Sequence, residues 1–483
     1  MSSRLGFSTF HNVIDEQLSP TVKARRCTNP STLEDNPAAP LSTQDDVDRA
    51  VANARKAFAT WSQVPLDARK QAVIDFAHAL SKEVDGFAEM LTKEKGRPLV
   101  LAKAEVQIGV QWLIQQAQMD FRDEEVWEKS DKTILTRYTP LGIAVGIVPW
   151  NFPITIACGK IAPALITGNV FIMKPSPFTP YCALKLCEFA QAYFPPGVFQ
   201  CLSGDDDLGP MLTHHEGVDK ISFTGSTEVG RRVIKACSET FKRVTLELGG
   251  NDAAIVFPDV DIPTTAAALA QLSWFNSGQV CVAVKRIYVH ASIYDEFLKA
   301  FTAITQSLVV GDGFVDGTTI GPVSNSLQYN RVRDLISDVI SQGQSVSYGG
   351  RAHASSKGNS IGYFIEPVIV DNPPDTSRVV QEEPFGPVVP LMQWNTEDEV
   401  IQRANATKFG LGASVWSADI SVAKRVARRL EAGTVWINNH MQLDPTVANG
   451  PYKHSGLGVE YGVAGMRSYC NVQSIHVSKP ELA

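Results

Sequence analysis

Apolar residues fall into short runs along the middle of the chain, and amphipathic segments separate these runs. Between residues 141 and 250, five runs predict buried strands: 142–148, 170–174, 198–202, 220–223 and 244–248. Amphipathic segments between them, such as 181–193 and 227–237, predict helices. Strands that alternate with helices at this interval predict βαβ crossovers and a parallel sheet. Such sheets bind ligands at the carboxyl ends of their strands, so the residues just after each run are the first functional candidates.

A second alternation of the same kind starts near Ala253. It predicts strands at 253–257, 286–289, 387–391, 413–416 and 434–437, and helices at 262–275, 293–308, 326–341, 397–406 and 420–431. We therefore expect a second α/β domain. Near the start of the chain, cap residues Ser42 and Thr43 and apolar positions at helical spacing predict a helix, and a second helix is expected over 66–80. The first forty residues predict irregular structure, and the Gly- and Ser-rich segment 343–362 predicts a surface loop.

Composition narrows the class of protein. The chain has 483 residues, of which 44% are hydrophobic and 20% are charged, as in ordinary globular proteins. Its net charge of −7 disfavours nucleic acid and anionic membranes as partners. The longest uncharged stretch, 138–159, is interrupted by prolines and predicts no membrane span, and the first residues lack the apolar core of a secretory signal. Eight scattered cysteines without a CxxC pair indicate reduced thiols, so we expect a cytoplasmic protein. His214, His215 and Glu216 lack the second spaced histidine of a zinc helix, so we expect no metal site.

Two sequence segments after predicted strands are suited to a nucleotide. No GxGxxG follows the first strand, so a dinucleotide site must be built in another way. In FTGSTEVG at 223–230, Gly225 allows close approach of the backbone, and Ser226 with the first N–H groups of the following helix suits a phosphate. The alternative is a plain capped turn. In KPSP at 174–177, Lys174 ends a strand and projects over the edge of the sheet; the alternative is a solvated lysine.

Three further segments carry candidate catalytic groups. In PWNFP at 149–153, the amide of Asn151 can donate to a developing oxyanion, or it satisfies turn backbone. In ELGGN at 247–251, partial desolvation would raise the pKa of the Glu247 carboxyl towards that of a useful base, or the segment is a hinge between domains. In NSGQVCVA at 276–283, Cys281 is either an inert buried thiol or a nucleophile that needs its thiolate form.

Together these segments resemble the aldehyde dehydrogenase superfamily, in the order of that family and over nearly the whole chain. The resemblance also includes EEPFGPV at 382–388 and KHSGLG at 453–458. It implies an α/β fold with a Rossmann-type parallel-sheet domain, a second α/β catalytic domain and a small oligomerisation flap. The implied boundaries are 1–119 and 141–249 for the cofactor-binding domain, 250–448 for the catalytic domain, 120–140 and 463–483 for the oligomerisation elements, and 449–462 for a loop at the substrate mouth.

The resemblance implies a covalent mechanism. Cys281 would add to the aldehyde carbon and form a thiohemiacetal, whose oxyanion the Asn151 side chain and the Cys281 N–H would hold. Hydride would pass to a nicotinamide, and Glu247 would activate the water that hydrolyses the resulting thioester. Covalent addition makes the carbon tetrahedral and electron-rich, which is what hydride departure requires. Lys174 completes the implied catalytic set.

The implied cofactor is NAD or NADP. Lys174 and Glu383 would contact its riboses, and Phe385 would border the nicotinamide. The full implied set is Ile147, Pro149, Trp150, Lys174, Ser176, Pro177, Gly209, Phe223, Gly225, Ser226, Val229, Leu248, Gly249, Glu383 and Phe385. Relatives that prefer NAD often carry Glu where this chain has Pro177, so the sequence leaves the choice between the two cofactors open.

Similarity places five residues around the aldehyde: Phe152, Ile156, Gly159, Phe275 and Val282. All are apolar or small, and Gly159 stands where many relatives have a bulky residue. We therefore expect a neutral, fairly bulky aldehyde rather than a semialdehyde acid. The segment 448–453 departs from the PFGGxK of many relatives, so the substrate cannot be carried over from them.

The family also implies a homodimer or homotetramer with a small-molecule aldehyde as its substrate. Two alternatives remain open at this point. One is a CoA-acylating dehydrogenase, although that branch usually lacks the base at Glu247. The other is a catalytically silent, ligand-binding relative, against which Cys281, Glu247 and Asn151 stand.

Overall fold

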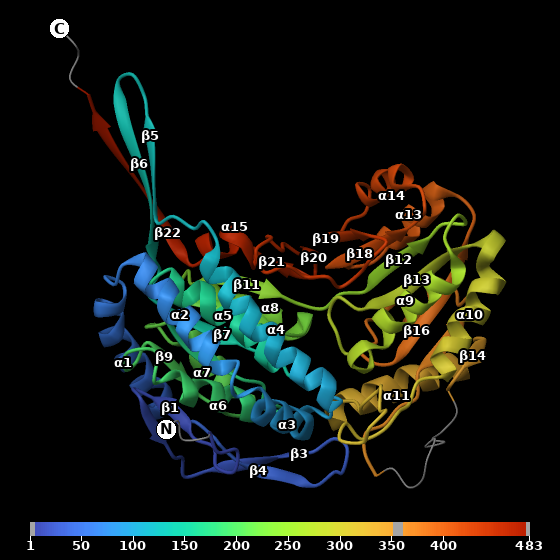
Figure 1. Ribbon diagram of the computed structural model, residues 1–483, viewed down its shortest axis with the longest axis horizontal. Helices are drawn as coiled ribbons and strands as arrows, with labels where there is room; N and C mark the ends of the chain where they lie inside the picture. Colours follow the sequence, from blue (N-terminus) through green and yellow to red (C-terminus); the bar gives the residue numbers. More distant parts are fainter. Residues whose placement is uncertain (1–4, 351–360, 480–483) are drawn as a thin grey trace.

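Two α/β lobes lie side by side in the computed structural model, and a small sheet projects from the first of them (Figure 1). The structure describes residues 5–350 and 361–479. Both parallel-sheet domains predicted from the sequence are confirmed. Among the described helices, none is long and apolar enough to cross a membrane.

The first lobe is built on an eight-stranded sheet with the order β2-β1-β9-β8-β7-β10-β11-β21. Its parallel centre consists of β7 (Ile143–Ile147), β8 (Val170–Lys174), β9 (Phe199–Cys201), β10 (Lys220–Thr224) and β11 (Arg243–Glu247). β7, β8 and β10 are buried along their whole length, which explains their continuous apolar runs. After β7, strands β8 and β9 extend the sheet on one side, and β10 and β11 extend it on the other. Open α/β sheets form a ligand crevice at the point where the strand order reverses in this way.

Helices cover this sheet: α1 (Gln44–Trp61), α2 (Leu66–Leu80), α3 (Val84–Lys95), α4 (Leu99–Gln118), α5 (Pro153–Ile166), α6 (Tyr181–Ala190), α7 (Leu208–His214) and α8 (Thr227–Ser238). Thr43 caps α1 in a capping box with Asp46, as its position predicted. Every residue of α5 is buried. Because α5 is apolar on all faces, it lacks the amphipathic contrast that reveals a helix in sequence, and it was not predicted.

The second lobe has a seven-stranded sheet with the order β14-β15-β16-β13-β12-β18-β19. Its strands are β12 (Asp252–Val256), β13 (Val284–His290), β14 (Val346–Tyr348), β15 (Val368–Asp371), β16 (Val388–Trp394), β18 (Gly412–Trp416) and β19 (Thr434–Ile437). Separate apolar cores lie on its two faces under α9 (Ile262–Trp274), α10 (Tyr294–Gln306), α11 (Ser326–Ser341), α12 (Arg378–Gln381), α13 (Glu397–Asn405) and α14 (Ile420–Ala427). β11 ends at Glu247 and β12 begins at Asp252, so the carboxyl edge of one sheet meets the amino edge of the other.

Two expectations about irregular segments were wrong. The first forty residues contain two hairpins, β1 (Asn12–Ile14) with β2 (Gln17–Ser19), and β3 (Ala24–Thr28) with β4 (Asp35–Pro40). β1 also pairs with β9, a contact between segments far apart in sequence. Within the expected loop 343–362, β14 forms an edge strand against β15, and residues 351–360 lie outside the described residues.

The projecting sheet consists of β5 (Glu124–Glu128), β6 (Lys132–Pro140) and β22 (Cys470–Ser478). β22 pairs with β6 in an unbroken antiparallel register from Cys470↔Pro140 to Ser478↔Lys132. The two segments predicted as oligomerisation elements therefore share one sheet. β17 (Phe409–Gly410), which precedes β18, pairs with β20 (Tyr452–Lys453) in a separate two-stranded sheet. β21 (Gly456–Leu457) and α15 (Gly462–Arg467) then lead into β22.

Candidate active site

The Cys281 thiol lies in the loop that leads into β13, at the junction of the two sheets. It is the only one of the eight cysteines that is partly exposed, although protein atoms surround most of the thiol. Its thiol lies close enough to the carboxylate of Glu247, at the carboxyl end of β11, for each group to shift the pKa of the other. Two candidate residues that the sequence separates widely are therefore close together.

Burial dominates the electrostatics of this pair. It raises the pKa of the Cys281 thiol well above its ordinary value, and the Glu247 carboxylate adds to this effect, whereas the Lys285 ammonium lowers it. Burial also raises the pKa of Glu247 to about 8, and the nearby Glu460 carboxylate contributes in the same direction. A carboxyl with such a pKa takes up and releases protons near neutral pH, as a general base must.

The sequence did not reveal the cluster of Lys160, Ser222 and Glu460, two members of which shift the pKa of Glu247. Lys160 Nζ in α5 lies 2.6 Å from Glu460 Oε1 and 2.9 Å from Ser222 Oγ, and the Ser222 hydroxyl donates to Glu460 at 3.0 Å. Glu460 belongs to the segment expected at the substrate mouth. A lysine inside an otherwise apolar helix was the available signal, because a buried ammonium needs an anionic partner.

Asn151 follows β7 and reaches the nucleophile loop. Its Nδ2 donates to the carbonyl of Gln279 at 3.1 Å, two residues before Cys281. A side-chain amide has two N–H groups, so one remains for an oxyanion. Arg97 fixes the turn from below by donating from Nη2 to the Asn151 carbonyl at 2.6 Å. Arg97 itself forms a fully buried ion pair with Glu105, which the sequence did not reveal.

The loop that carries Cys281 has an unusual backbone. Asn276 and Ser277 adopt positive φ angles of 53° and 59°. For residues with a side chain this conformation costs about 1 kcal/mol each, so contacts must hold it. Ser277 Oγ donates to the Gly321 carbonyl at 2.8 Å, and Gln279 Nε2 donates to the Asn276 carbonyl at 2.9 Å. These bonds fix the approach of the chain to Cys281.

Residues from both lobes meet where the predicted cofactor residues of the first sheet face Glu383 and Phe385 of the second lobe. The rings of Trp150 and Phe385 pack edge to face at 5.2 Å. The Gly250 N–H donates to Glu383 Oε1 at 3.1 Å, and a Cβ at Gly249 would lie 2.3 Å from Glu383 Oε2. Glycine at 249 therefore leaves room for the Glu383 carboxylate in the position that it occupies at this edge of the first sheet.

Lys174 ends β8, and its ammonium is buried, with its one hydrogen bond to the Pro175 carbonyl at 3.1 Å. Burial lowers its pKa to about 8, which the carboxylates of Asp206, Asp205 and Asp207 oppose. Gly209 lies beside its side chain. Ser226 caps α8 by accepting from the N–H of Val229 at 3.3 Å. The other predicted cofactor residues lie in or directly after the strands of the first sheet: Ile147, Pro149, Ser176, Pro177, Phe223, Gly225 and Leu248.

Apolar side chains pack around Cys281 in a cluster separate from the predicted cofactor residues. The rings of Phe152 and Phe275 stack with centroids 6.1 Å apart and an interplanar angle of 23°. Together with Cys281 they pack against a cluster whose members include Val280, Val282, Ala283, Leu411, Trp436, Met441 and Leu443. Met441 and Leu443 were not predicted from sequence.

Gly159 does not open this pocket as its small size suggested. A Cβ at this position would lie 3.0 Å from the Tyr461 ring and 3.2 Å from the Trp112 ring. These two rings pack edge to face at 4.9 Å and occupy the space that a bulky residue at 159 would fill. Ile156, one turn earlier in α5, is buried.

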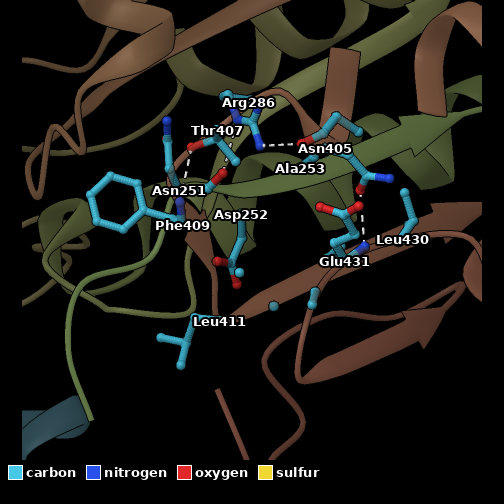
Figure 2. Close-up of a pocket in the computed structure, with 15 residues that line it drawn as sticks. Asn251, Asp252, Ala253, Arg286, Asn405, Thr407, Phe409, Leu411, Leu430 and Glu431 are labelled. Carbon is cyan, nitrogen blue, oxygen red and sulfur yellow. Dashed lines mark hydrogen bonds between the residues drawn. The ribbon is translucent and has the colours of Figure 1, made fainter. Parts of the chain in front are cut away.

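A small cavity of about 20 Å³ lies at the start of β12 (Figure 2). Asp252 lines it, and within the described residues neither of its carboxylate oxygens has a hydrogen-bond partner. His440 Nε2 lies 3.6 Å from Asp252 Oδ2 and donates to the Val282 carbonyl at 2.9 Å. The cavity has room for about one water molecule and not for an aldehyde. In the described parts of the chain, no three His, Cys, Asp or Glu side chains gather as a metal site would require.

Residues 19–475 match the model of the aldehyde dehydrogenase family. The aldehyde dehydrogenase LUC3 of a Fusarium species is 40% identical over 475 residues, which cover 98% of this chain and 100% of LUC3. The phenylacetaldehyde dehydrogenase of Pseudomonas fluorescens is 35% identical over 466 residues, which cover 93% of this chain and 92% of that protein.

Solved structures agree with these relatives. The NAD-dependent aldehyde dehydrogenase of Sinorhizobium meliloti superposes with a TM-score of 0.94 at 30% identity, covering 99% of this chain and 98% of that one. An NADP-dependent enzyme of E. coli superposes with a TM-score of 0.93 at 32% identity, covering 98% of this chain and 99% of that one.

Proposed function

Because the chain belongs to the aldehyde dehydrogenase family and is an NAD(P)-dependent, aldehyde-oxidising oxidoreductase, we propose that it forms carboxylic acids by covalent catalysis at Cys281. The proximity of a partly exposed thiol to the Glu247 carboxylate carries this proposal. The geometry suits a nucleophile with an adjacent base. It does not suit a silent relative, in which nothing would keep these two groups together.

The first half of the reaction is the formation of the thiohemiacetal. The Cys281 thiol, which is partly exposed, releases its proton to solvent, and the thiolate sulfur adds to the aldehyde carbon. The free N–H of the Asn151 amide and the Cys281 backbone N–H hold the oxyanion. Two neutral donors suit this task, since a stronger electrostatic partner would hinder collapse of the tetrahedral carbon.

The residues around Glu383 fit a nicotinamide cofactor. Glycine at 249 leaves room for the Glu383 carboxylate, and the packed rings of Trp150 and Phe385 lie in the same region and would border the nicotinamide. Lys174 and Glu383 would hold the two riboses, and Ser226 with the start of α8 would hold a phosphate. When bound, the cofactor supplies the ring that accepts hydride.

The second half of the reaction is hydrolysis of the thioester on Cys281. Glu247 lies beside the sulfur and can deprotonate a water that attacks the acyl carbon. We place release to water above release to CoA for this reason. The purified chain, given benzaldehyde and NAD, should produce one benzoate for each NADH. Addition of CoA should change neither the products nor the rate. Formation of benzoyl-CoA in place of benzoate would support the acylating alternative, and absence of both products would support the silent one.

The division of labour along the chain follows from the same proposal. Residues 1–119 and 141–249 would bind the cofactor, 250–448 would carry the nucleophile, and 449–462 would border the substrate mouth. The sheet of β5, β6 and β22 exposes Val126, Trp127, Val472 and Val477, and we propose that it joins copies of the chain in a homodimer or homotetramer. All eight cysteines are free thiols, which suits the cytoplasm.

We expect a preference for neutral aldehydes of moderate size. The stacked Phe152 and Phe275 rings and the cluster around Cys281 offer apolar contact. The two cations nearby, Arg97 over the Phe152 ring and Lys285 beside Cys281, are already paired with Glu105 and Glu383, so neither is free to bind a second carboxylate. The value of kcat/KM for benzaldehyde or hexanal should exceed that for succinic semialdehyde at least about tenfold. The named substrate of the Pseudomonas fluorescens relative is likewise neutral and aromatic.

Phe275→Ala should reduce the preference for benzaldehyde over hexanal about fivefold, with Phe314→Ala on the surface as the control. The opposite ranking of the two classes would overturn the substrate assignment.

Cofactor preference should favour NAD. Pro177 removes the carboxylate that many NAD-preferring relatives use, but Asp205, Asp206 and Asp207 place negative charge beside Lys174. The 2′-phosphate of NADP adds about two negative charges there. We expect kcat/KM with NAD to exceed that with NADP about tenfold.

The Asp206→Asn/Asp207→Asn double variant tests this explanation. It should lower the ratio of kcat/KM with NAD to kcat/KM with NADP. In calorimetry it should bind 2′,5′-ADP more tightly than wild type does, while binding of 5′-AMP stays the same. Asp131→Asn, at the tip of the projecting sheet, is the control; an unchanged ratio in the double variant would refute the electrostatic explanation.

A further inference from the structure

Lys285 is a buried cation next to the nucleophile for which the mechanism above has no task. It is the second residue of β13, and 3% of its side chain is exposed. Its ammonium donates to the carbonyl of Cys281 and lies 3.0 Å from Glu383 Oε1. The Phe385 ring centroid is 5.9 Å from the same nitrogen. One ammonium thus touches the nucleophile's own peptide and the two residues assigned to the cofactor.

The groups around this ammonium account for its burial. An unpaired buried ammonium is strongly unfavourable, and Glu383 supplies the opposite charge. Oε1 of Glu383 is shared between Lys285 and the Gly250 N–H, whereas Oε2 faces Gly249. The carboxylate is therefore fixed through one oxygen, and its other oxygen is left on the side of the first sheet. A carboxylate that must accept hydrogen bonds from ribose hydroxyls benefits from such orientation.

We propose that Lys285 is a positioning residue that couples the nucleophile loop to the cofactor-binding carboxylate, by holding the Cys281 peptide at its carbonyl and Glu383 at one oxygen. This inference rests on the proposed function, since it assigns Cys281 as the nucleophile and Glu383 as a cofactor ligand. Lys285 acts through these two residues and touches neither the aldehyde nor the reacting atoms.

Two measurable consequences follow, one on each side of the ammonium. On the Cys281 side, the positive charge favours the thiolate, against burial and the carboxylates of Glu247 and Glu383. On the Glu383 side, loss of the ammonium frees a carboxylate that only the Gly250 N–H then orients. A single neutral substitution should therefore weaken thiolate formation and cofactor binding together, although the two functions lie on different segments of the chain.

The test uses Lys285→Met, which keeps an unbranched side chain only one atom shorter and removes the charge. Without cofactor, iodoacetamide should alkylate Cys281 about tenfold more slowly at neutral pH, with the midpoint of the pH profile moved upward by about one unit. The other seven cysteines are buried, so peptide mass spectrometry can follow this thiol alone. In calorimetry, the Kd for NAD should rise about tenfold. Glu383→Gln should move the alkylation midpoint in the opposite direction, because the Glu383 carboxylate disfavours the thiolate.

Lys185→Met is the matched control. Lys185 is equally buried and lies 2.6 Å from Glu188 in α6, away from the nucleophile. It should destabilise the fold without changing the alkylation profile or the Kd for NAD. If Lys285→Met does not fold, Lys285→Gln removes the same charge and keeps a donor for the Cys281 carbonyl. An alkylation midpoint and a Kd that both match those of wild type would overturn the inference.

Combining Lys285→Met with Glu383→Gln separates positioning from general damage. If Lys285 acts on NAD through Glu383, the double variant should bind NAD no more weakly than Glu383→Gln alone; fully additive losses would contradict the coupling. Neither measurement needs aldehyde turnover. A wild-type chain that oxidises no aldehyde would refute the proposed function, while the shifts in alkylation and NAD binding would still decide the role of Lys285.

Discussion

Cys281→Ala should abolish aldehyde oxidation and leave the binding of NAD unchanged within about twofold. The loss in kcat should reach at least about 10⁴-fold, because removal of an attacking nucleophile leaves only binding and oxyanion stabilisation. The steady-state rate of NADH formation measures the first effect, and calorimetry with NAD measures the second. The Cys281 side chain packs with Phe152 and Phe275, so replacement by alanine leaves a small space in an apolar cluster and should not disturb the cofactor side.

The other cysteines provide the control for this prediction. Cys201 and Cys237 are buried, and burial raises the pKa of Cys237 to about 11. Such thiols are inert at physiological pH. Cys237→Ala should therefore retain wild-type kcat even where it lowers the melting temperature. Turnover by Cys281→Ala at a rate close to wild type would remove the covalent mechanism altogether, whatever the family.

The sequence was most informative where chemistry follows directly after an apolar strand. Asn151, Lys174 and Glu247 come at the ends of β7, β8 and β11, and parallel pairing brings these ends to one edge. The alternation of apolar runs and amphipathic segments was enough to predict both sheets. Glu383 came from the family resemblance alone, and the resemblance also decided whether Cys281 is an inert thiol or the nucleophile, since no local pattern joins either residue to that edge.

Buried charged partners could not be predicted from local pattern. Lys160 meets Glu460, and Arg97 meets Glu105, inside the protein, and in sequence each of these residues is indistinguishable from a surface charge. Their pairing depends on how α4 and α5 pack together and on the return of the chain before β22. Gly159 illustrates the same limit, because the residues that fill its space, Trp112 and Tyr461, come from distant segments.

The N-terminal hairpins failed for a different reason. Their strands have three to six residues, too few for an alternating pattern to stand out. β1 pairs with β9 through Val13 and Cys201, and this long-range contact completes the edge of the first sheet. β14 was hidden in the same way inside a Gly- and Ser-rich segment, where β15 supplies its partner.

The fall of kcat at acid pH (the acid limb of the pH profile) should reflect protonation of Glu247. Burial raises its pKa to about 8, and the carboxyl acts as a base only after it has lost its proton. Below that pH the active fraction falls about tenfold per unit, so the hydrolytic rate should rise with pH through about 8 and then level off. Glu460→Gln removes a carboxylate that raises this pKa, so the limb should move to lower pH. A pH profile of kcat for both proteins measures the shift.

Glu247→Gln should divide the two halves of the reaction. Glutamine cannot accept a proton from water, so kcat should fall about 10²–10⁴-fold and the limb near pH 8 should disappear. The first half should survive, because the Glu247 carboxylate disfavours the Cys281 thiolate and its removal makes the thiol easier to ionise. Rapid mixing with benzaldehyde should show a burst of about one NADH per active site, with the acyl group found on Cys281 by mass spectrometry.

Glu34→Gln, an exposed carboxylate near the N-terminal hairpins, is the matched control and should leave both the burst and the pH profile as in wild type. Two results would count against the role of Glu247. A variant that keeps wild-type kcat would show that another group activates the water. A slow variant without a burst would move the requirement for Glu247 to the attack of the thiol, because the acyl-enzyme would then never form and hydrolysis could not be the step that the carboxylate serves.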